Sequence, residues 1–321
     1  MSSIFKDRSF RLSILLTFIF LGSGLFCLLS GIAIYGWALF LLLPIVLGMA
    51  IGALPNKGWA YFGAGFAVVA FLFMLLMGEL AGFMCVLMAM GLVLPFIFLG
   101  TIIIHLVRRY KELKAPTKLP VLLLPLLLFL IAAPVEHFLT GQHKQVIEVK
   151  TEKVFNYTPQ QVYDAIKSVD TLVAEKPFWM KVDLPVPVKC VLQKEEVGGL
   201  RTCYFNGGRL SRGDFGSGVI TEKITRLEKA RVLQMDVIGC NLIGRNWLGF
   251  KQAIYYFEKV GDGSCRLIRI TTYTSELTPR FYWQPLEEMG IREEHDYVFN
   301  NLLNDLKRKY GSGNIMAPPA R

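Results

Sequence analysis

The stretch that decides the architecture is residues 12–54, LSILLTFIFLGSGLFCLLSGIAIYGWALFLLLPIVLGMAIGAL, which contains no charged side chain. As one helix, these 43 residues would measure about 65 Å, roughly twice the ~30 Å hydrocarbon core of a bilayer. We therefore expect two membrane-spanning helices, at about 12–34 and 37–54. The turn between them falls near residues 31–37, where two glycines accompany Tyr35 and Trp37.

Three further apolar runs predict spans at about 59–78, 84–104 and 119–135. Glu79 is the one charged residue from 59 to 104, and we place it in a turn between two helices because a lone carboxylate is costly inside a bilayer. The last run has 17 residues, contains three prolines and would reach only about 25 Å. A re-entrant or surface segment is therefore the alternative to a fifth span.

The composition requires a second, water-soluble part. A mean hydropathy of +0.42 with 53% apolar residues is too apolar for a soluble protein of 321 residues, whereas 19% charged residues are too many for a membrane bundle alone. The net charge of +10 divides into +6 over residues 1–135 and +4 over residues 136–321. The sequence thus predicts a transmembrane α-helical bundle at 1–143, a soluble domain at 144–311 and a flexible tail at 312–321.

The orientation follows from the basic residues. All nine Lys and Arg residues of 1–135 fall at the N-terminus or in the second and fourth loops, which lie on one side of a five-span bundle. The positive-inside rule makes that side the cytoplasm, so we expect the N-terminus inside and the soluble domain outside. If residues 119–135 do not cross the bilayer, the soluble domain lies in the cytoplasm instead.

In the soluble part the apolar residues alternate. A strand at 146–155 precedes a short helix that Thr158 and Pro159 begin. Strand-like runs follow at 188–193, 200–205, 218–227, 232–237, 251–260 and 265–275. Glycines between successive runs are typical of hairpins, and a long amphipathic helix ends before Gly311. This order predicts an α+β helix-grip domain, in which a curved antiparallel sheet holds a long C-terminal helix.

Residues 146–310 resemble the SRPBCC superfamily, whose START and Bet v 1-like domains include polyketide cyclases. The resemblance rests on YTPQQVYDAI at 157–166, KPFWMKVDLPVP at 176–187, GGLRTCYF at 198–205 and GIREEHDY at 290–297, and it is strongest to bacterial members. It implies a cavity between sheet and helix for a lipid, sterol or polyketide. With the orientation expected from the basic residues, we place the chain in a bacterial inner membrane with the soluble domain in the periplasm or outside. The superfamily shares no catalytic set, so the resemblance selects no reaction.

The residues that we expect to line this cavity are Arg201, Trp247, Ile291, His295, Val298 and Leu302. A guanidinium inside an apolar cavity needs an anionic partner, so Arg201 would meet a ligand, lie at the surface or pair within the protein. His295 would contact a ligand head group or move a proton, with an ordinary core histidine as the alternative. Trp247 would line the cavity mouth, or simply pack.

Other site classes have little support in the sequence. The four histidines are dispersed and no Cys-x-x-Cys or His-Glu-x-x-His spacing occurs, so we expect no metal and no other cofactor. GDFGSG at 213–218 lacks the ending of a phosphate loop and is interpreted as a turn. Because Lys and Arg alternate with Asp and Glu in the soluble part, we also expect no nucleic-acid partner.

The cysteines and glycines leave alternatives open. Cys190, Cys203, Cys240 and Cys265 could pair in three ways outside the cell, but their spacing also suits small buried residues, and we expect free thiols. Two glycine pairs, Gly48 with Gly52 and Gly78 with Gly82, would let helices approach closely, either within one bundle or between chains of a homo-oligomer.

Together these observations predict a membrane-anchored helix-grip domain that binds a membrane lipid or another small hydrophobic or amphiphilic ligand at the membrane surface. We find no catalytic constellation in the sequence. A membrane-tethered cyclase or hydrolase of the same fold is one alternative, and a structural or partner-binding module with a closed cavity is the other.

Overall fold

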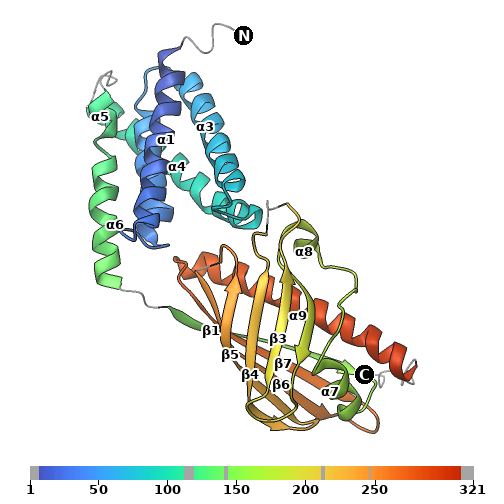
Figure 1. The fold of residues 1–321 in the computed structure, drawn as a ribbon. Helices are drawn as coiled ribbons and strands as arrows, with labels where there is room; N and C mark the ends of the chain where they lie inside the picture. The colour runs from blue at the N-terminus through green and yellow to red at the C-terminus, as the bar shows by residue number, and fades with distance from the viewer. Residues whose placement is uncertain (1–6, 112–118, 141–143, 211–213, 246, 312–321) are drawn as a thin grey trace. The chain divides into compact units, whose positions relative to one another are not determined.

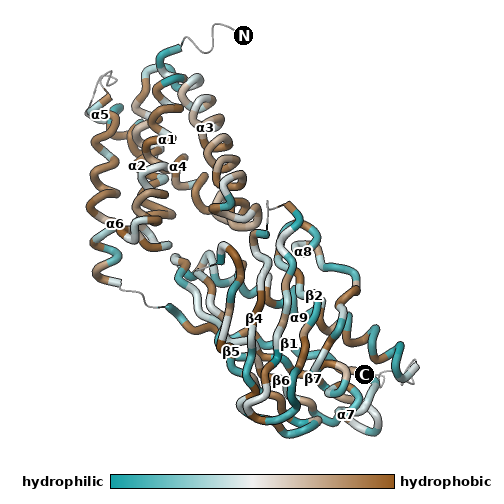
Figure 2. Tube along the Cα trace, viewed as in Figure 1, coloured by the Kyte–Doolittle hydropathy of each residue, from teal (hydrophilic) through white to brown (hydrophobic). Residues whose placement is uncertain are grey.

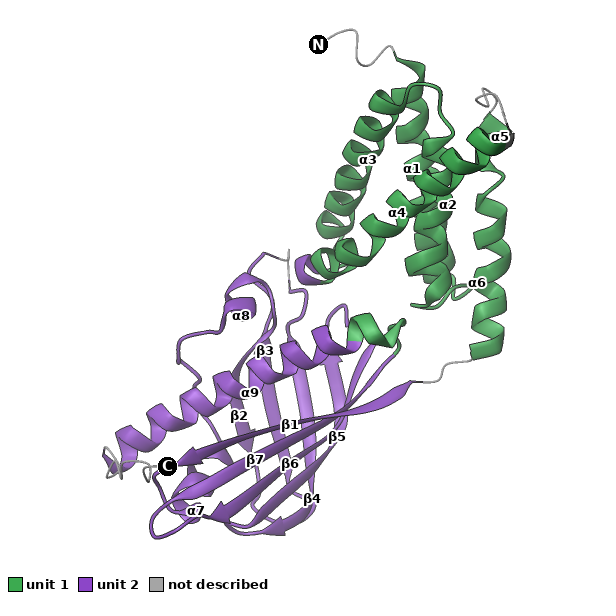
Figure 3. Cartoon of the chain, turned by 180° about the vertical axis from the view of Figure 1, so that it is seen from behind, with its two compact units in different colours: residues 1–81, 85–143, 276–283 green, residues 82–84, 144–275, 284–321 purple. Residues whose placement is uncertain are grey.

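The structure is a computed structural model that describes residues 7–111, 119–140, 144–210, 214–245 and 247–311 (Figure 1). The predicted flexible tail lies outside these residues. The chain forms two compact units (Figure 3). The first comprises residues 1–81, 85–143 and 276–283, and the second comprises residues 82–84, 144–275 and 284–321.

The first unit is helical and predominantly hydrophobic along its helices (Figure 2). Its elements are α1 (Arg8–Leu29), the π-helix η2 (Ala38–Leu42), α2 (Leu43–Gly52), α3 (Lys57–Met77), α4 (Phe83–Lys111), α5 (Leu119–Leu123) and α6 (Leu126–Thr140). Helix α1 begins at Asp7, whose carboxylate accepts hydrogen bonds from the amides of Ser9 and Phe10. Glu79 lies exposed in the turn between α3 and α4 with a φ of 56°, which confirms its predicted place.

Four helical segments are long and apolar enough to cross a membrane, namely Arg8–Leu29, Lys57–Met77, Phe83–Tyr110 and Leu119–Thr140. The prediction of five spans is therefore wrong. Segment Ala38–Gly52 has only 15 helical residues, or about 22 Å, because the turn that follows it takes up Ala53 and Leu54, which we assigned to the helix. Segment Leu119–Thr140, in contrast, has 22 residues, because the helix continues through Glu136 and His137.

Small residues hold α2 against α4. A Cβ atom on Gly48 would collide with the carbonyl oxygen of Ile97, and one on Gly100 would collide with the carbonyl oxygen of Ile45. A Cβ atom on Gly52 would approach the Cα of Thr101 to 3.0 Å. The two backbones thus cross in direct contact, and the glycine pair of α2 serves packing within this chain. The prediction for Gly78 and Gly82 is wrong, because both lie in the turn between α3 and α4.

Polar contacts gather several helix ends at one end of the first unit. The side chain of Asn56, between α2 and α3, donates to the carboxylate of Asp7 at 3.1 Å, and the backbone amide of Asn56 donates to the hydroxyl of Ser9 at 3.2 Å. Lys57 Nζ lies 2.8 Å from Nδ1 of His105, near the end of α4. The start of α1, the end of α2, the start of α3 and the last turns of α4 therefore lie together, and successive helices alternate in direction.

The second unit is a seven-stranded antiparallel sheet with the order β1-β7-β6-β5-β4-β3-β2. Its strands are β1 (Gln145–Phe155), β2 (Val186–Leu192), β3 (Leu200–Asn206), β4 (Gly218–Glu228), β5 (Val232–Leu242), β6 (Leu248–Lys259) and β7 (Cys265–Ser275). Two short helices, α7 (Pro159–Ile166) and α8 (Phe178–Val182), precede β2, and α9 (Arg280–Tyr310) follows β7. The sheet curls around α9 (Figures 1 and 3), which is the predicted helix-grip architecture.

Local sequence explains how the second unit begins. Thr158 and Gln161 form a capping box at the start of α7, with Pro159 in the first turn. Strands β1 and β7 then pair along their whole length, from Gln145 opposite Ser275 to Phe155 opposite Cys265. This pairing brings the first strand of the domain beside the last one and makes β1 an outer strand of the sheet.

Candidate functional site

The inner face of α9 lies against the sheet. Ile291, His295, Val298 and Leu302 are all buried, as expected for residues that share one helical face. Ile291 packs in an apolar cluster with Val149 of β1 and with other residues of the sheet. The fold thus brings four of the six candidate residues to one interior surface.

Arg201 of β3 also lies inside the domain and is only 3% exposed. Its Nη1 atom lies 3.2 Å from a carboxylate oxygen of Glu222 on β4, and Nη2 donates to the carbonyl oxygen of Ile166 at 3.4 Å. Its buried Nε has no hydrogen-bond partner. Arg201 is therefore paired within the protein, which is one of the three arrangements considered from the sequence, and it retains one free donor.

A second buried arginine, Arg269 of β7, was not predicted. Its Nη2 and Nη1 atoms bind the two carboxylate oxygens of Glu294 on α9, at 2.8 and 3.2 Å, and its buried Nε has no partner. The alternation of inward and outward residues along β7 could have predicted its position. Arg269 has the same parity as the apolar Cys265 and Leu267, so it must face the interior with them.

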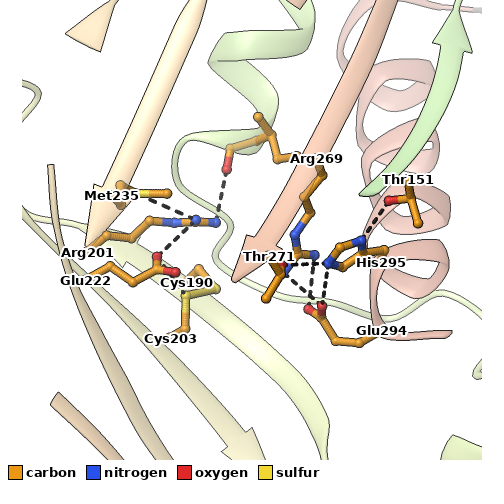
Figure 4. A network of polar contacts seen from close by, with 11 residues as sticks. Thr151, Cys190, Arg201, Cys203, Glu222, Met235, Arg269, Thr271, Glu294 and His295 are labelled. Atoms are coloured by element: carbon orange, nitrogen blue, oxygen red, sulfur yellow. Dashed lines mark hydrogen bonds and ion pairs between the residues drawn. A yellow bond between two sulfur atoms is a disulfide. The ribbon is translucent and has the colours of Figure 1, made fainter. Parts of the chain in front are cut away.

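The two arginines converge on one aromatic ring. The guanidinium carbons of Arg201 and Arg269 lie 5.7 and 5.5 Å from the ring centre of Tyr255, a buried residue of β6. Strand β7 lies next to β6, whereas β3 lies on the other side of β6 with β5 and β4 between them. The curl of the sheet thus brings distant strands together around Tyr255, and Figure 4 shows the polar network.

His295 lies between two threonines beside this network (Figure 4). Its Nδ1 atom is 2.7 Å from the hydroxyl of Thr151 on β1, and its Nε2 atom is 2.7 Å from the hydroxyl of Thr271 on β7. Burial, together with the charges of Arg269 and Arg292, holds the pKa of His295 well below its usual value. The imidazole is therefore neutral, and both nitrogens link α9 to the sheet.

Trp247 lies apart from these residues, in the connection between β5 and β6, and is partly exposed. No contact of Trp247 with the buried network is observed among the described residues. Its predicted role at a cavity mouth stays a prediction.

The network is balanced in charge, because two guanidinium groups meet two carboxylates and the imidazole is neutral. Such buried ion pairs are rarely the most stable filling of a protein interior, because apolar residues of similar volume avoid the desolvation of two charges. Stability alone therefore gives a poor account of why charged residues occupy the centre of this domain.

A disulfide bond joins Cys190 of β2 to Cys203 of β3 (Figure 4). The two residues stand directly opposite each other in the strand register, with their Cα atoms 4.1 Å apart. The expectation of free thiols is therefore wrong for this pair, because the register, which the sequence does not reveal, brings the two sulfur atoms together. Cys240 and Cys265 are free. No group of three His, Cys, Asp or Glu side chains that could hold a metal occurs among the described residues.

Comparison with known proteins adds three similarities of fold. A protein of unknown function from Staphylococcus aureus has a TM-score of 0.38 and 15% identity, over 53% of this chain and 99% of its own. The Zhui aromatase/cyclase from a Streptomyces species has a TM-score of 0.35 and 13% identity, over 51% of this chain and 96% of its own. An AHSA1-like protein from Aeromonas hydrophila has a TM-score of 0.33 and 11% identity, over 54% and 100%. No protein-family model and no curated protein matches the sequence.

Proposed function

We propose that this protein is a membrane-anchored helix-grip domain that binds an amphiphilic, lipid-like ligand with an acidic group. The observation that carries the proposal is the pair of buried guanidinium groups around Tyr255, each with a free Nε donor. A carboxylate or phosphate oxygen is the usual partner of a guanidinium donor. Arg201 and Arg269 could bind such an oxygen and keep their own carboxylate partners.

The apolar part of the ligand would meet side chains at one end of the sheet. Partly buried apolar residues there pack against two buried clusters, the one that contains Ile291 and a second formed by Cys190, Cys203 and Ile220. These partly buried residues are Phe205, Val237, Leu242, Leu248 and Phe250. Phe205 lies four residues beyond Arg201 on β3, about 13 Å away along the strand. An amphiphile with its acidic group at the arginines would thus extend its apolar part toward these residues.

Anchoring is supported by the four helices that are long enough to cross a membrane. Helix α1 begins at the end of the first unit where Asp7 binds Asn56. The segment from Ala38 to Gly52 ends next to Asn56, so its beginning at Trp37 lies at the opposite end of the first unit. Glu136, in the last turns of α6, accepts a hydrogen bond from the backbone amide of Trp37, so α6 also ends there. With the basic N-terminus in the cytoplasm, and with the shorter segment Ala38–Gly52 also crossing the bilayer, α6 leads to the other side of a bacterial inner membrane, where a Cys190–Cys203 disulfide would also be stable.

Labelling tests this orientation. Asp262, in the exposed turn between β6 and β7, is replaced by Cys in a chain that also carries Cys240→Ser, and intact cells are treated with a membrane-impermeant maleimide. Labelling of intact cells is expected. If labelling requires lysis, the domain lies in the cytoplasm and the proposed orientation is wrong.

Ligand binding is tested with two probes, palmitic acid and hexadecanol, which differ in the acidic group. The purified full-length chain is mixed with each probe and analysed by native mass spectrometry. We expect one bound palmitic acid and about tenfold weaker binding of hexadecanol, which corresponds to about 1.4 kcal/mol. In the double variant Arg201→Met/Glu222→Met, which removes both charges of one pair together, the preference for the acid should weaken, because only Arg269 remains to bind it.

Val298→Trp distinguishes an open cavity from a filled core. In a cavity, the indole should occupy the space, displace both probes and leave the melting temperature nearly unchanged. In a filled core, overpacking costs typically about 1–3 kcal/mol or more. Val154→Trp, at an exposed position of β1, is the matched control. A wild-type chain that binds neither probe, together with a strongly destabilised Val298→Trp, would show that the domain is a closed module.

A further inference from the structure

The first unit contains a groove of about 520 Å³, which lies between the helical segment that begins at Ala38 and the last turns of α6. This volume falls within the usual range of small-molecule sites. The groove is lined by Trp37, Ala38, Leu41, Leu42, Ile45, Ala132, Val135, Glu136, Leu139 and Thr140. Ala38 on one side and Ala132 on the other have small side chains, which leave the space open. Larger apolar side chains form most of the remaining surface.

The groove is shorter than the thickness of one membrane leaflet. Its lining residues extend from Trp37 to Ile45 on one side and from Ala132 to Thr140 on the other, which is about 12 Å along each helix. One leaflet contributes about half of the ~30 Å hydrocarbon core. The space therefore suits part of one acyl chain that lies along the helices in a single leaflet.

A fixed carboxylate lies at one end of this apolar groove. The two carboxylate oxygens of Glu136 accept hydrogen bonds from the backbone amides of Trp37 and Ala38, at 2.7 and 2.9 Å. Gly36 leaves room for this arrangement, because a Cβ atom at that position would displace the carboxylate. An ionised carboxylate offers about four acceptor positions, so Glu136 can accept further hydrogen bonds from a ligand.

The residues around Glu136 indicate the charge of the ligand. Glu136 is the one charged residue among those that line the groove, and the neighbouring indole of Trp37 is 49% exposed. An ammonium group can donate hydrogen bonds to a carboxylate and lie against an indole face. An anionic head group would instead meet a like charge in a region of low dielectric.

We propose that this groove is a binding site for one phospholipid with an ammonium head group, which lies at Glu136 and Trp37 while an acyl chain fills the groove. The site rests on the proposed membrane anchoring, but it is separate from the interior of the helix-grip domain. It would hold a specific lipid at the end of α6, the helix that leads into the second unit. Phosphatidylethanolamine and phosphatidylcholine share the required chemistry, and they differ in whether the ammonium can donate hydrogen bonds.

The test uses the full-length chain in nanodiscs that contain phosphatidylethanolamine, phosphatidylcholine and phosphatidylglycerol in equal amounts. Native mass spectrometry after release identifies the lipids that stay bound. Glu136→Gln removes the charge but retains an acceptor oxygen, and Ala132→Phe fills the groove. Ile131→Phe is the matched control, because Ile131 lies exposed on the same helix and does not line the groove.

We expect about tenfold enrichment of ammonium lipids over phosphatidylglycerol in the wild type, which Glu136→Gln should abolish. Ala132→Phe should remove the bound lipid, whereas Ile131→Phe should retain it. Preference for phosphatidylethanolamine would assign recognition to the carboxylate, and equal binding of phosphatidylcholine would assign it to Trp37. Absence of bound lipid, absence of a head-group preference or enrichment of phosphatidylglycerol would overturn the proposal. Failure of the chain to enter nanodiscs would instead contradict the anchoring.

Discussion

Replacing Glu222 by Gln gives the most direct measurement of the buried network. Glu222 is 7% exposed and faces Arg201 at 3.2 Å. Gln keeps the shape of the side chain but removes its charge, so Arg201 would stay ionised without a counter-ion. Breaking a buried ion pair in this way typically costs about 3–5 kcal/mol. For a domain of this size, the melting temperature should fall by roughly 6–20 °C.

Two companion variants make this result specific. In Arg201→Met/Glu222→Met both charges are absent, so the melting temperature should equal or exceed that of the wild type. Glu228→Gln is the matched control on the same strand, because its pair with Arg226 lies at the surface and contributes little. Its melting temperature should be unchanged.

The assay must report on the helix-grip domain alone. The amide I infrared band of β-sheet does so, because every described element of the first unit is helical. Thermal unfolding of the full-length chain in detergent is therefore followed at this band for Glu222→Gln and its controls. Equal melting temperatures for Glu222→Gln and Glu228→Gln would refute the argument, because they would show that water or an ion reaches Arg201.

Three further predictions concern pH, the disulfide and helix packing. Below pH 6.5 the unfolded chain binds a proton that the buried His295, with its lowered pKa, does not yet bind, so stability should decrease as the pH is lowered from this value, by up to about 1.4 kcal/mol per pH unit, and calorimetry should show a flatter pH profile for His295→Gln. Reduction of the Cys190–Cys203 bond, whose sequence separation is 13, should cost about 3 kcal/mol, and a thiol reagent should find four reactive cysteines in the denatured, unreduced chain. Gly48→Val should lower the melting temperature in detergent by separating α2 from α4, whereas Gly22→Val, which has no atom near its Cβ position, should leave it unchanged.

The order of elements could be predicted because the apolar period changes along the chain, from continuous runs to alternation and then to helical spacing. The lengths of individual strands could not be predicted as well. Strand β5 was predicted to end at residue 237, but it continues to Leu242 through Gly239 and Asn241. These residues do not continue the apolar alternation, and they are held in the strand by pairing with β4, which the sequence of β5 does not show.

Part of the candidate site could be predicted from the sequence for the same reason. Helical spacing placed His295 and Val298 on the inner face of α9, where the structure has them. Arg269 and Glu294 were not among the predicted residues, although the alternation of β7 places Arg269 inside. Their partnership depends on the curl of the sheet, which brings β7 and α9 together. No local pattern in the sequence encodes that curl.

The two outer strands of the sheet, β1 and β2, matter for the proposed anchoring, because they would affect how copies of the protein coexist in a membrane. Open strand edges can pair between molecules, and confinement to a plane raises the frequency of such encounters. The guanidinium of Arg292 donates to the carbonyl of Lys150 on β1, at 2.9 Å. On β2, the backbones of Val169 and Leu172 bond those of Cys190 and Val188, and Pro187 has no amide hydrogen to donate. Parts of both edges are thereby occupied, which protects crowded neighbours from aggregation through their sheets.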